Sequence, residues 1–321
     1  MLLALVFAGA GLVWLAQRPM QFQNDLLVVR ITPGAGIEQV GEALHQAGLP
    51  LPVWVQMLIG RAKGYNGKLR AGYYEFKSGL SFLEILGKIA RGETTQVKVR
   101  IIEGWTFAKI RQSLEQNSAL TIDTVGMSEA DLLSAVGSQA KQAEGLFFPA
   151  TYTVDKLTST REVFRQAYEV GRQRLAKAWA QRTPGLPLAN AYEALILASL
   201  IEKETGLAAD RGKIGSVFIN RLRLDMPLQT DPTLIYGMGD MYDGKLGRED
   251  KYIDHPYNTY KYKGLPPTPI AAAGDAALLA ATQPPKTDFL YFVARGDGSS
   301  QFSQNLDQHN RAVNTYLKGA P

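Results

Sequence analysis

Hydrophobic residues recur in the same order in three stretches of the N-terminal third of the chain. The stretches VRITPGAGIEQVGEAL from Val29, YEFKSGLSFLEILGKI from Tyr74 and VRIIEGWTFAKIRQSL from Val99 align without a gap. In each stretch, alternating apolar residues come first, a glycine follows, and apolar residues spaced three and four apart come last. Alternation is typical of a strand, and the longer spacing is typical of an amphipathic helix. We therefore predict three strand-turn-helix units in series.

The first two units lie in residues 21–96 and resemble a LysM-like module, a small βα domain that holds glycan chains. A common strand-helix building block without a ligand explains the same pattern equally well, so both interpretations stay open. The third unit opens a larger domain, which we expect to span residues 97–321 and to be of mixed α/β structure. The predicted fold class is α+β.

The first sixteen residues, MLLALVFAGAGLVWLA, carry no charged side chain, and Gln17, Arg18 and Pro19 end the run. A bilayer span needs about 20 apolar residues, so the run is somewhat short. A buried core helix is one interpretation. Because Trp14 lies near the polar edge and the run is at the N-terminus, we predict a transmembrane anchor or uncleaved signal over residues 1–20.

A second apolar run, LASLIEKETG, extends from Leu197 to Gly206 and contains two glutamates. Asn190 is a candidate N-cap for the helix that this run predicts. On such a helix Leu197 lies within about 20° of the direction of Glu204. Glu202 lies about 160° from Glu204 on the same helix, so the two carboxylates point almost oppositely. They cannot act as one catalytic pair while the helix is continuous.

Glu204 caps the most apolar stripe of this helix, which gives its carboxyl group a possible chemical role. A carboxyl group there loses hydration, and its pKa rises because the charged form is destabilised more. It can then donate a proton near neutral pH, which cleavage of a glycosidic bond requires. The alternative is that Glu202 and Glu204 are both surface residues near a helix end, with Gly206 as the C-cap.

The composition narrows the range of functions. The chain has 45% hydrophobic and 20% charged residues, which is globular, and 35 Lys and Arg against 30 Asp and Glu give a net charge of +5. This weak positive charge slightly favours an anionic surface or polymer and does not indicate nucleic acid. The chain has no cysteine, and its three histidines fall in different segments. We therefore expect no metal and no cofactor.

An aromatic cluster occurs in EGLFFPATY, which contains Phe148 and Tyr152. These rings are either ordinary core or the floor of a sugar site, because aromatic faces stack on pyranose rings. The stretch from Gln229 to Asp231 is similarly ambiguous, since Asp-Pro is a frequent turn former.

Four segments together resemble one family. They are LASLIEKETG, KIGSVFINRLRLDMPLQTDPTLIYG, YNTYKYKGLPPTPIAAAG and FLYFVARGDGSSQFSQNLDQHN, and in this order they are similar to the YceG-like family of endolytic murein transglycosylases. The resemblance covers the chain from the predicted anchor to the end. It implies a bacterial inner-membrane protein, spanning the membrane once, with its catalytic domain in the periplasm.

In activity, the resemblance implies cleavage within peptidoglycan glycan strands to give 1,6-anhydro ends, which would terminate the elongation of nascent strands. It implies that the catalytic acid is a glutamate of the EKE element, and the helical geometry favours Glu204. Glu202 is the second candidate for the acid and is otherwise expected in a supporting role, for instance by binding Lys203 or Arg211. It also implies possible association with peptidoglycan synthases or with the elongation or division machinery. The expected substrate-binding residues are Asn220, Gln229, Thr230, Asp231, Tyr257, Asn258 and Tyr260, together with Phe148 and Tyr152. His309 and Asn310 are expected to support the structure near the cleft.

Two other functions stay open at this point. A muramidase would hydrolyse the same bond and would need a second carboxylate such as Asp231, whereas lytic cleavage needs only Glu204. A membrane-tethered, non-catalytic scaffold would bind glycan without cutting it.

Overall fold

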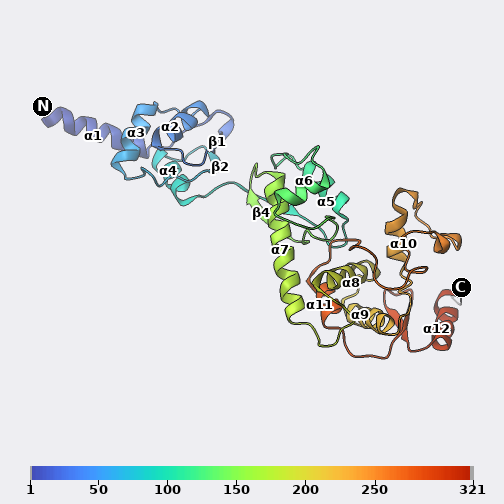
Figure 1. Ribbon diagram of the computed structural model, residues 1–321. Helices are drawn as coiled ribbons and strands as arrows, with labels where there is room; N and C mark the ends of the chain where they lie inside the picture. Colours follow the sequence, from blue (N-terminus) through green and yellow to red (C-terminus); the bar gives the residue numbers. More distant parts are fainter. Residues whose placement is uncertain (1, 319–321) are drawn as a thin grey trace. The chain divides into compact units, whose positions relative to one another are not determined.

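A computed structural model describes residues 2–318 of the chain (Figure 1). The described residues divide into two compact units. The first unit runs to Lys98 and also takes in residues 119–121 and 153–158. The second unit contains the other residues from Val99 onward.

The first unit is built of short helices around a two-stranded sheet. Its elements are α1 (Leu2–Gln17), η1 (Gln23–Asp25), β1 (Leu26–Ile31), α2 (Ile37–Gln46), α3 (Val53–Ala62), β2 (Gly72–Lys77), α4 (Phe82–Arg91) and the start of β3 (Gln96–Arg100). β1 and β2 are antiparallel, with Leu27 opposite Phe76 and Val29 opposite Tyr74. Those four side chains are buried, because alternate residues of a strand face the same side of the sheet.

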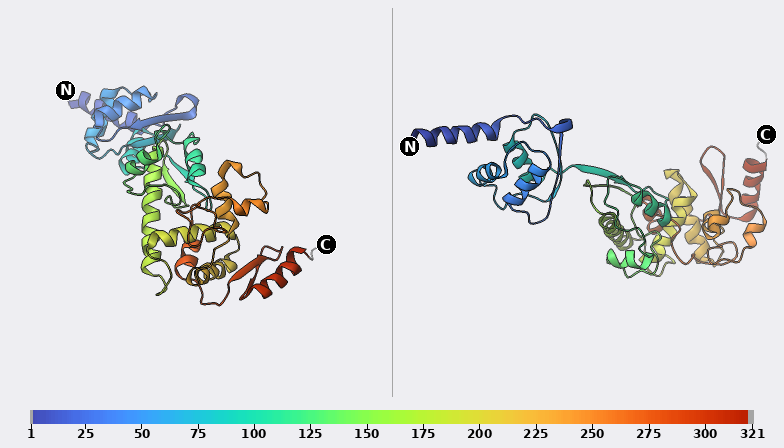
Figure 2. Two further views of the ribbon diagram at one scale, coloured as in Figure 1. Left: turned by 45° about the vertical axis from the view of Figure 1, so that its right-hand side comes forward. Right: turned by 90° about the horizontal axis from the view of Figure 1, so that it is seen from above.

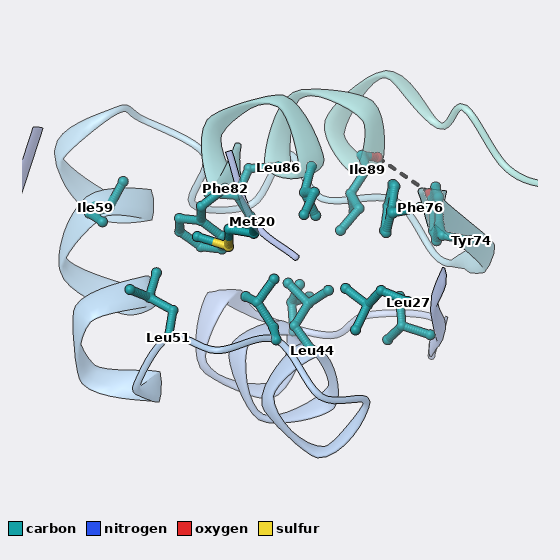
Figure 3. Packing of buried hydrophobic residues seen from close by; sticks show 14 of the residues in the cluster. Met20, Leu27, Leu44, Leu51, Ile59, Tyr74, Phe76, Phe82, Leu86 and Ile89 are labelled. Atoms are coloured by element: carbon teal, nitrogen blue, oxygen red, sulfur yellow. Dashed lines mark hydrogen bonds between the residues drawn. The ribbon is translucent and has the colours of Figure 1, made fainter. Parts of the chain in front are cut away.

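The core of this unit is formed where α2 and α4 face each other, as Figure 3 shows. Leu44 of α2 and Phe82 and Leu86 of α4 point into the same interior and are fully buried. The hydroxyl of Tyr74 donates to the carbonyl oxygen of Ile89 at 3.4 Å, which ties β2 to α4. Each large apolar side chain buried in this way contributes about 1.5–3 kcal/mol to stability.

The prediction of three strand-turn-helix units is confirmed. The pairs are β1 with α2, β2 with α4, and β3 with α5 (Phe107–Glu115). The turn glycines Gly34, Gly79 and Gly104 have φ of 80°, 93° and 77°. Only glycine adopts this left-handed region without strain, which explains why the same residue recurs in all three turns. Two residues later, Ser81 and Thr106 cap the second and third helices by accepting backbone N–H groups.

The predictions of a membrane anchor over residues 1–20 and of an inner-membrane protein with a periplasmic catalytic domain are wrong. Between residues 2 and 318, no helix is long and apolar enough to cross a membrane. The apolar run forms α1, which has 16 residues, fewer than the roughly 20 that a span requires. Ala16 and Met20, each 2% exposed, pack into the core of the first unit instead.

The second unit is mainly helical, and its small sheets again have two strands each. Its elements are the end of β3, α5, α6 (Glu129–Ala135), the start of β4 (Thr151–Asp155), α7 (Thr160–Ala180), α8 (Ala191–Glu204), α9 (Ala208–Arg223), α10 (Asp231–Met238), η2 (Gly239–Met241), η3 (Glu249–Tyr252), α11 (Asp275–Thr282), β5 (Tyr291–Ala294), β6 (Ser300–Ser303), α12 (Leu306–Val313) and η4 (Asn314–Lys318). β3 pairs with β4, and β5 with β6. α12 packs against the β5–β6 hairpin (Figure 2). The prediction of mixed α/β structure agrees with these elements.

α8 lies at the centre of this unit, in contact with α9 and α11 (Figure 1). Its residues from Ala194 to Ile201 are all buried, as expected for a helix that is apolar on every side. The predicted N-cap is confirmed, because the Asn190 side chain accepts the Glu193 backbone N–H at 3.1 Å. This buried helix carries both glutamates of the EKE sequence at its C-terminal end.

Candidate active site

Glu204 is the last residue of α8, which ends because Thr205 takes an extended conformation. The Thr230 hydroxyl donates a hydrogen bond to the Glu204 carboxylate. Burial raises the pKa of Glu204 to about 7, and the negative charge of Asp231 acts in the same direction. The Thr230 hydrogen bond and the positive charge of Arg221 lower the pKa and partly offset that rise. Both the protonated and the ionised form of the Glu204 carboxyl are therefore present near neutral pH.

A cavity of about 600 Å³ opens at Glu204. Its walls come from α9, from the segments before and after α10, from η3, from the β5–β6 hairpin and from α12. Polar and aromatic side chains in the lining include Arg221, Gln229, Asp231, Lys251, Tyr260, Tyr291, His309 and Asn310. The space is wide enough for sugar-sized groups, and most of these side chains can hydrogen-bond to hydroxyl or acetamido groups.

Thr230 is held in place by a small network of threonines. Its backbone N–H donates to the Thr259 hydroxyl at 3.1 Å, and its carbonyl accepts the Thr233 hydroxyl at 2.8 Å. The Thr233 and Thr259 hydroxyls are also 2.8 Å apart. Gln229 donates its N–H to the Thr259 carbonyl at 3.0 Å and has φ of 52°. These bonds fix the segment so that the Thr230 hydroxyl meets the Glu204 carboxylate.

Arg221 supports the cavity from the side of α9. Its guanidinium donates to the carbonyl oxygens of Leu290 at 2.7 Å and Leu228 at 2.9 Å, and its Cζ is 5.0 Å from the ring centroid of Tyr291. The side chain thus joins α9 to the chain before α10 and to the start of β5. These partners are up to 69 residues away in the chain, so the sequence gives no sign of them.

A second carboxylate lies in the same cavity. Asp231, the first residue of α10, accepts a hydrogen bond from the Tyr260 hydroxyl, and both residues line the cavity. Asp231 is close enough to Glu204 for its charge to raise the pKa of Glu204. The structure therefore brings together four residues that the sequence assigned to the site, namely Gln229, Thr230, Asp231 and Tyr260, around the expected acid.

Glu202 points away from this cavity, as the helical spacing predicts. Its carboxylate pairs with Arg211 at 3.3 Å and accepts the Gly274 N–H at 2.9 Å. The side chain is only 5% exposed. Burial raises its pKa, and the Gly274 hydrogen bond and Arg211 oppose the rise. Glu202 therefore joins the end of α8 to the start of α9 and to the chain before α11.

Two asparagines that we expected to bind substrate lie outside the lining of this cavity. Asn220 donates to the backbone carbonyls of Thr287 at 2.8 Å and Phe289 at 3.0 Å. Asn258 is fully buried and donates to the carbonyls of Lys251 at 3.0 Å and Ile253 at 2.7 Å. Both amides hold backbone segments together, a role that a sequence motif does not reveal.

Three aromatic residues of the expected site are also absent from this lining. Phe148 and Tyr152 are 8% and 7% exposed, and the Tyr152 hydroxyl donates to the Phe148 carbonyl at 2.7 Å. The Tyr257 hydroxyl lies 2.6 Å from that of Thr268. The burial of Phe148 and Tyr152 agrees with the core interpretation that the sequence left open for them, and Tyr257 is partly buried and packs against the core.

Glu144 is a buried carboxyl group that no sequence motif assigns to the site. It is 7% exposed, and burial raises its pKa to about 7, the same value as for Glu204. Its carboxylate accepts the Phe107 N–H at 3.0 and 3.1 Å and the Tyr236 hydroxyl at 3.1 Å, and it does not line the cavity. The only sequence signal is a charged residue before an apolar run. A raised pKa therefore does not identify the catalytic acid without the cavity.

His309 and Asn310, which we expected near the cleft, line the cavity from α12. The ring of His309 stacks on that of Tyr291 with centroids 5.1 Å apart. Burial lowers the pKa of His309, so its ring stays neutral near pH 7. Within the described part of the chain, His, Asp and Glu side chains form no group of three or more that could hold a metal ion.

Known proteins are similar to this chain over most of its length. The model of the YceG-like family matches residues 29–315. A protein of Bacillus subtilis (strain 168) named endolytic murein transglycosylase is 33% identical over 308 residues, which cover 90% of this chain and 84% of that protein. A protein of the same name from Streptococcus pneumoniae (strain D39) is 29% identical, and the match covers 89% of this chain but 58% of the relative. The chain thus spans little more than half the length of the streptococcal protein.

A solved structure is also similar. The crystal structure of a yceG-like protein from Listeria monocytogenes superposes with a TM-score of 0.53 at 28% sequence identity. The superposition covers 90% of this chain and 99% of that one.

Proposed function

Because the chain belongs to the YceG-like family, we propose that it is an endolytic murein transglycosylase, which cuts peptidoglycan glycan strands within their length. The observation that carries the proposal is the position of Glu204, a carboxyl group with a pKa of about 7 at a cavity of about 600 Å³. The names of the relatives from Bacillus and Streptococcus support the same activity.

In the first step, the protonated Glu204 donates its proton to the oxygen that joins N-acetylmuramic acid to N-acetylglucosamine. The bond from that oxygen to C1 of muramic acid breaks, and the glucosamine end leaves as an alcohol. In the second step, the Glu204 carboxylate removes the proton of the muramic C6 hydroxyl, whose oxygen bonds to C1. The product is a 1,6-anhydro ring, and Glu204 is protonated again. No water is consumed.

The neighbours of Glu204 suit both steps. Burial keeps the carboxyl protonated before the first step, whereas the Thr230 hydrogen bond and the charge of Arg221 stabilise the carboxylate that exists between the steps. A pKa near 7 is effective for a group that acts first as an acid and then as a base. Glu202 is proposed as a positioning residue, which fixes the end of α8 through Arg211 and Gly274.

The first unit is proposed to hold the glycan strand, in keeping with its resemblance to a LysM-like module. Trp54 on α3 is 66% exposed and offers a ring on which a sugar can stack. Trp54→Ala in the full chain should weaken cosedimentation with insoluble peptidoglycan, and binding equal to that of the unchanged chain would argue against this role. Association with peptidoglycan synthases or with the elongation or division machinery remains a prediction.

The activity is tested by incubating the chain with uncrosslinked glycan strands and analysing the products by mass spectrometry. The unchanged chain should produce anhydromuramic ends, and Glu204→Gln should lower their rate of formation by a factor on the order of 100 to 10,000, the usual contribution of a general acid-base group. Glu144→Gln is a matched control, because Glu144 is buried with the same pKa but lies outside the cavity. If the strands stay intact with the unchanged chain as well as with both variants, a non-catalytic glycan scaffold is favoured.

A muramidase is the second candidate, because Asp231 lies in the same cavity as Glu204. A hydrolase would release reducing muramic acid ends, and water would supply the new oxygen. If the chain is a muramidase, Asp231→Asn should abolish the reaction. If the chain is a lytic transglycosylase, the Asp231→Asn variant should still form anhydro ends. Products from reactions in ¹⁸O-labelled water separate the two mechanisms directly, since only hydrolysis incorporates the label.

A further inference from the structure

A second cavity, of about 460 Å³, adjoins the one at Glu204. It is lined by Lys251, Tyr252, Tyr260 and Lys261, and the first and third of these also line the cavity at Glu204. Two cations and two phenol rings face this space, and no carboxylate belongs to its lining. The lining therefore favours a ligand that combines an anionic group with an apolar or sugar surface.

The two lysines differ in whether their charge is already neutralised. Lys261 pairs with Asp254 at 3.1 Å. Lys251 has no carboxylate within ion-pair distance among residues 2–318, and its ammonium nitrogen lies 4.5 Å from the ring centroid of Tyr260. An ammonium group over an aromatic face keeps its hydrogen-bond donors available to an incoming anion. Lys251 and Tyr260, which line both cavities, form the wall between them. Lys251 is thus the cation of this wall that can bind a carboxylate of a ligand.

Asn258, which is fully buried, holds both residues of this wall. Its amide donates to the carbonyl of Lys251 at 3.0 Å, and its carbonyl oxygen accepts the N–H of Tyr260 at 3.0 Å. One side chain therefore fixes the backbone of the cation and of the ring beneath it. The Tyr260 hydroxyl in turn donates to Asp231 beside Glu204, which links the wall to the catalytic group.

The substrate class of the proposed function contains one sugar that this arrangement can recognise. N-acetylmuramic acid differs from N-acetylglucosamine only by a lactyl ether at C3. That ether ends in a carboxylate when the strand is bare, and in a peptide with its own carboxylates when the strand carries stems. A polymer of N-acetylglucosamine alone has no such charge.

We propose that Lys251 binds a carboxylate carried by the muramic acid residue next to the scissile bond, and so makes the enzyme select murein over uncharged glycans. This inference rests on the proposed function for the identity of the polymer. The carboxylate comes either from the lactyl group itself or from the peptide attached to it.

The test compares Lys251→Gln with the unchanged chain on three strands: peptide-bearing, stripped of peptide, and stripped with the lactyl carboxylates converted to methyl amides. Lys263→Gln is the matched control, since Lys263 is a nearby lysine that pairs with Asp225 at 2.5 Å and lines neither cavity. Rates of chain cleavage give KM and kcat. Calorimetry in a Glu204→Gln background gives the dissociation constant without cleavage.

For Lys251→Gln we expect KM and the dissociation constant to rise about tenfold on at least one carboxylate-bearing strand, as for loss of one partly exposed charge-assisted hydrogen bond. On the amidated strand, Lys251→Gln should match the unchanged chain. Lys251→Arg should restore much of the affinity, which a purely structural defect would not allow. An effect on the bare strand identifies the lactyl carboxylate, and an effect only on the peptide-bearing strand identifies the peptide.

The inference is overturned if Lys251→Gln and Lys263→Gln behave alike on all three strands. It is also overturned if Lys251→Gln loses the same affinity for the amidated strand as for the charged ones. If the unchanged chain cuts no strand, the proposed function fails, and the calorimetric comparison still decides whether Lys251 binds the carboxylate.

Discussion

Replacing Glu204 by glutamine should change how the stability of the protein depends on pH, as well as slowing catalysis. The folded protein raises the pKa of this carboxyl to about 7 from an ordinary value of 4.5. Below pH 4.5 the group is protonated in both the folded and the unfolded chain, and it adds no pH dependence. Between pH 4.5 and about 7 the unfolded chain loses the proton while the folded chain keeps it, so the free energy of unfolding falls as pH rises.

The size of the effect follows from the difference between the two pKa values. Each unit corresponds to about 1.4 kcal/mol, so the shift at Glu204 gives a loss on the order of 3 kcal/mol, complete above pH 7. Glutamine is neutral at every pH and keeps an oxygen that can accept the Thr230 hydrogen bond. The Glu204→Gln variant should therefore gain stability relative to the unchanged chain as pH rises through this window. A buried catalytic group of this kind lowers stability in exchange for activity.

Urea denaturation of both proteins, followed by circular dichroism at pH 5, 6, 7 and 8, measures this difference. The unchanged chain and Glu204→Gln share every other titrating group, including Glu144, whose pKa is also raised to about 7. The difference in their free energies of unfolding therefore isolates Glu204. A difference that stays constant from pH 5 to pH 8 would refute the argument that burial holds the proton on this carboxyl.

Two further predictions concern the packing around α8. Glu202→Ala leaves Arg211 and the Gly274 N–H without their partner and should lower the free energy of unfolding by about 3 kcal/mol, which denaturant unfolding measures. The products should still end in anhydromuramic acid, which mass spectrometry checks. A change of product would contradict a positioning role for Glu202. Gly215→Ala would place a Cβ 2.4 Å from the Ala280 carbonyl oxygen, so α9 must move from α11 at a loss of about 1–3 kcal/mol. An unchanged thermal midpoint for that variant would show that the two helices separate without strain.

The local features of the fold could be predicted from the sequence, because they depend on residues close together in the chain. The three turns require glycine at Gly34, Gly79 and Gly104, and the spacing between them and the apolar residues reveals each helix. The opposite directions of Glu202 and Glu204 follow in the same way from the helical period alone.

The composition of the cavity could be predicted only in part. The segment from Gln229 to Asp231 reaches Glu204 as expected, but the contacts that hold it there come from Thr259, 29 residues after Thr230. Arg221 is held by backbone carbonyls in distant segments, and the backbone carbonyl of Lys251 is held by the Asn258 side chain; no local pattern marks such partners. Polar residues such as Asn258 look alike in sequence whether they bind a sugar or hold a loop.

The apolar N-terminal run shows a different limit. Its composition suits a membrane span, whereas its length of 16 helical residues, the burial of Ala16 and the contacts of α1 with α3 and α4 suit a helix that packs on its own unit. Hydropathy shows that a segment is removed from water, but it does not specify whether lipid or the protein's own core surrounds the segment.

The position of Glu204 at the very end of α8 also has an electrostatic consequence. The last four carbonyl groups of a helix have no partner within it, and the aligned peptide dipoles place about half a negative charge there. This field opposes ionisation of the Glu204 carboxyl, in the same direction as burial, and it depends only on which way the chain runs through the helix. The same glutamate at the opposite end would meet a positive field and release its proton more readily. The pH range in which the acid works is therefore set partly by the direction of one helix, independently of every side chain in the cavity.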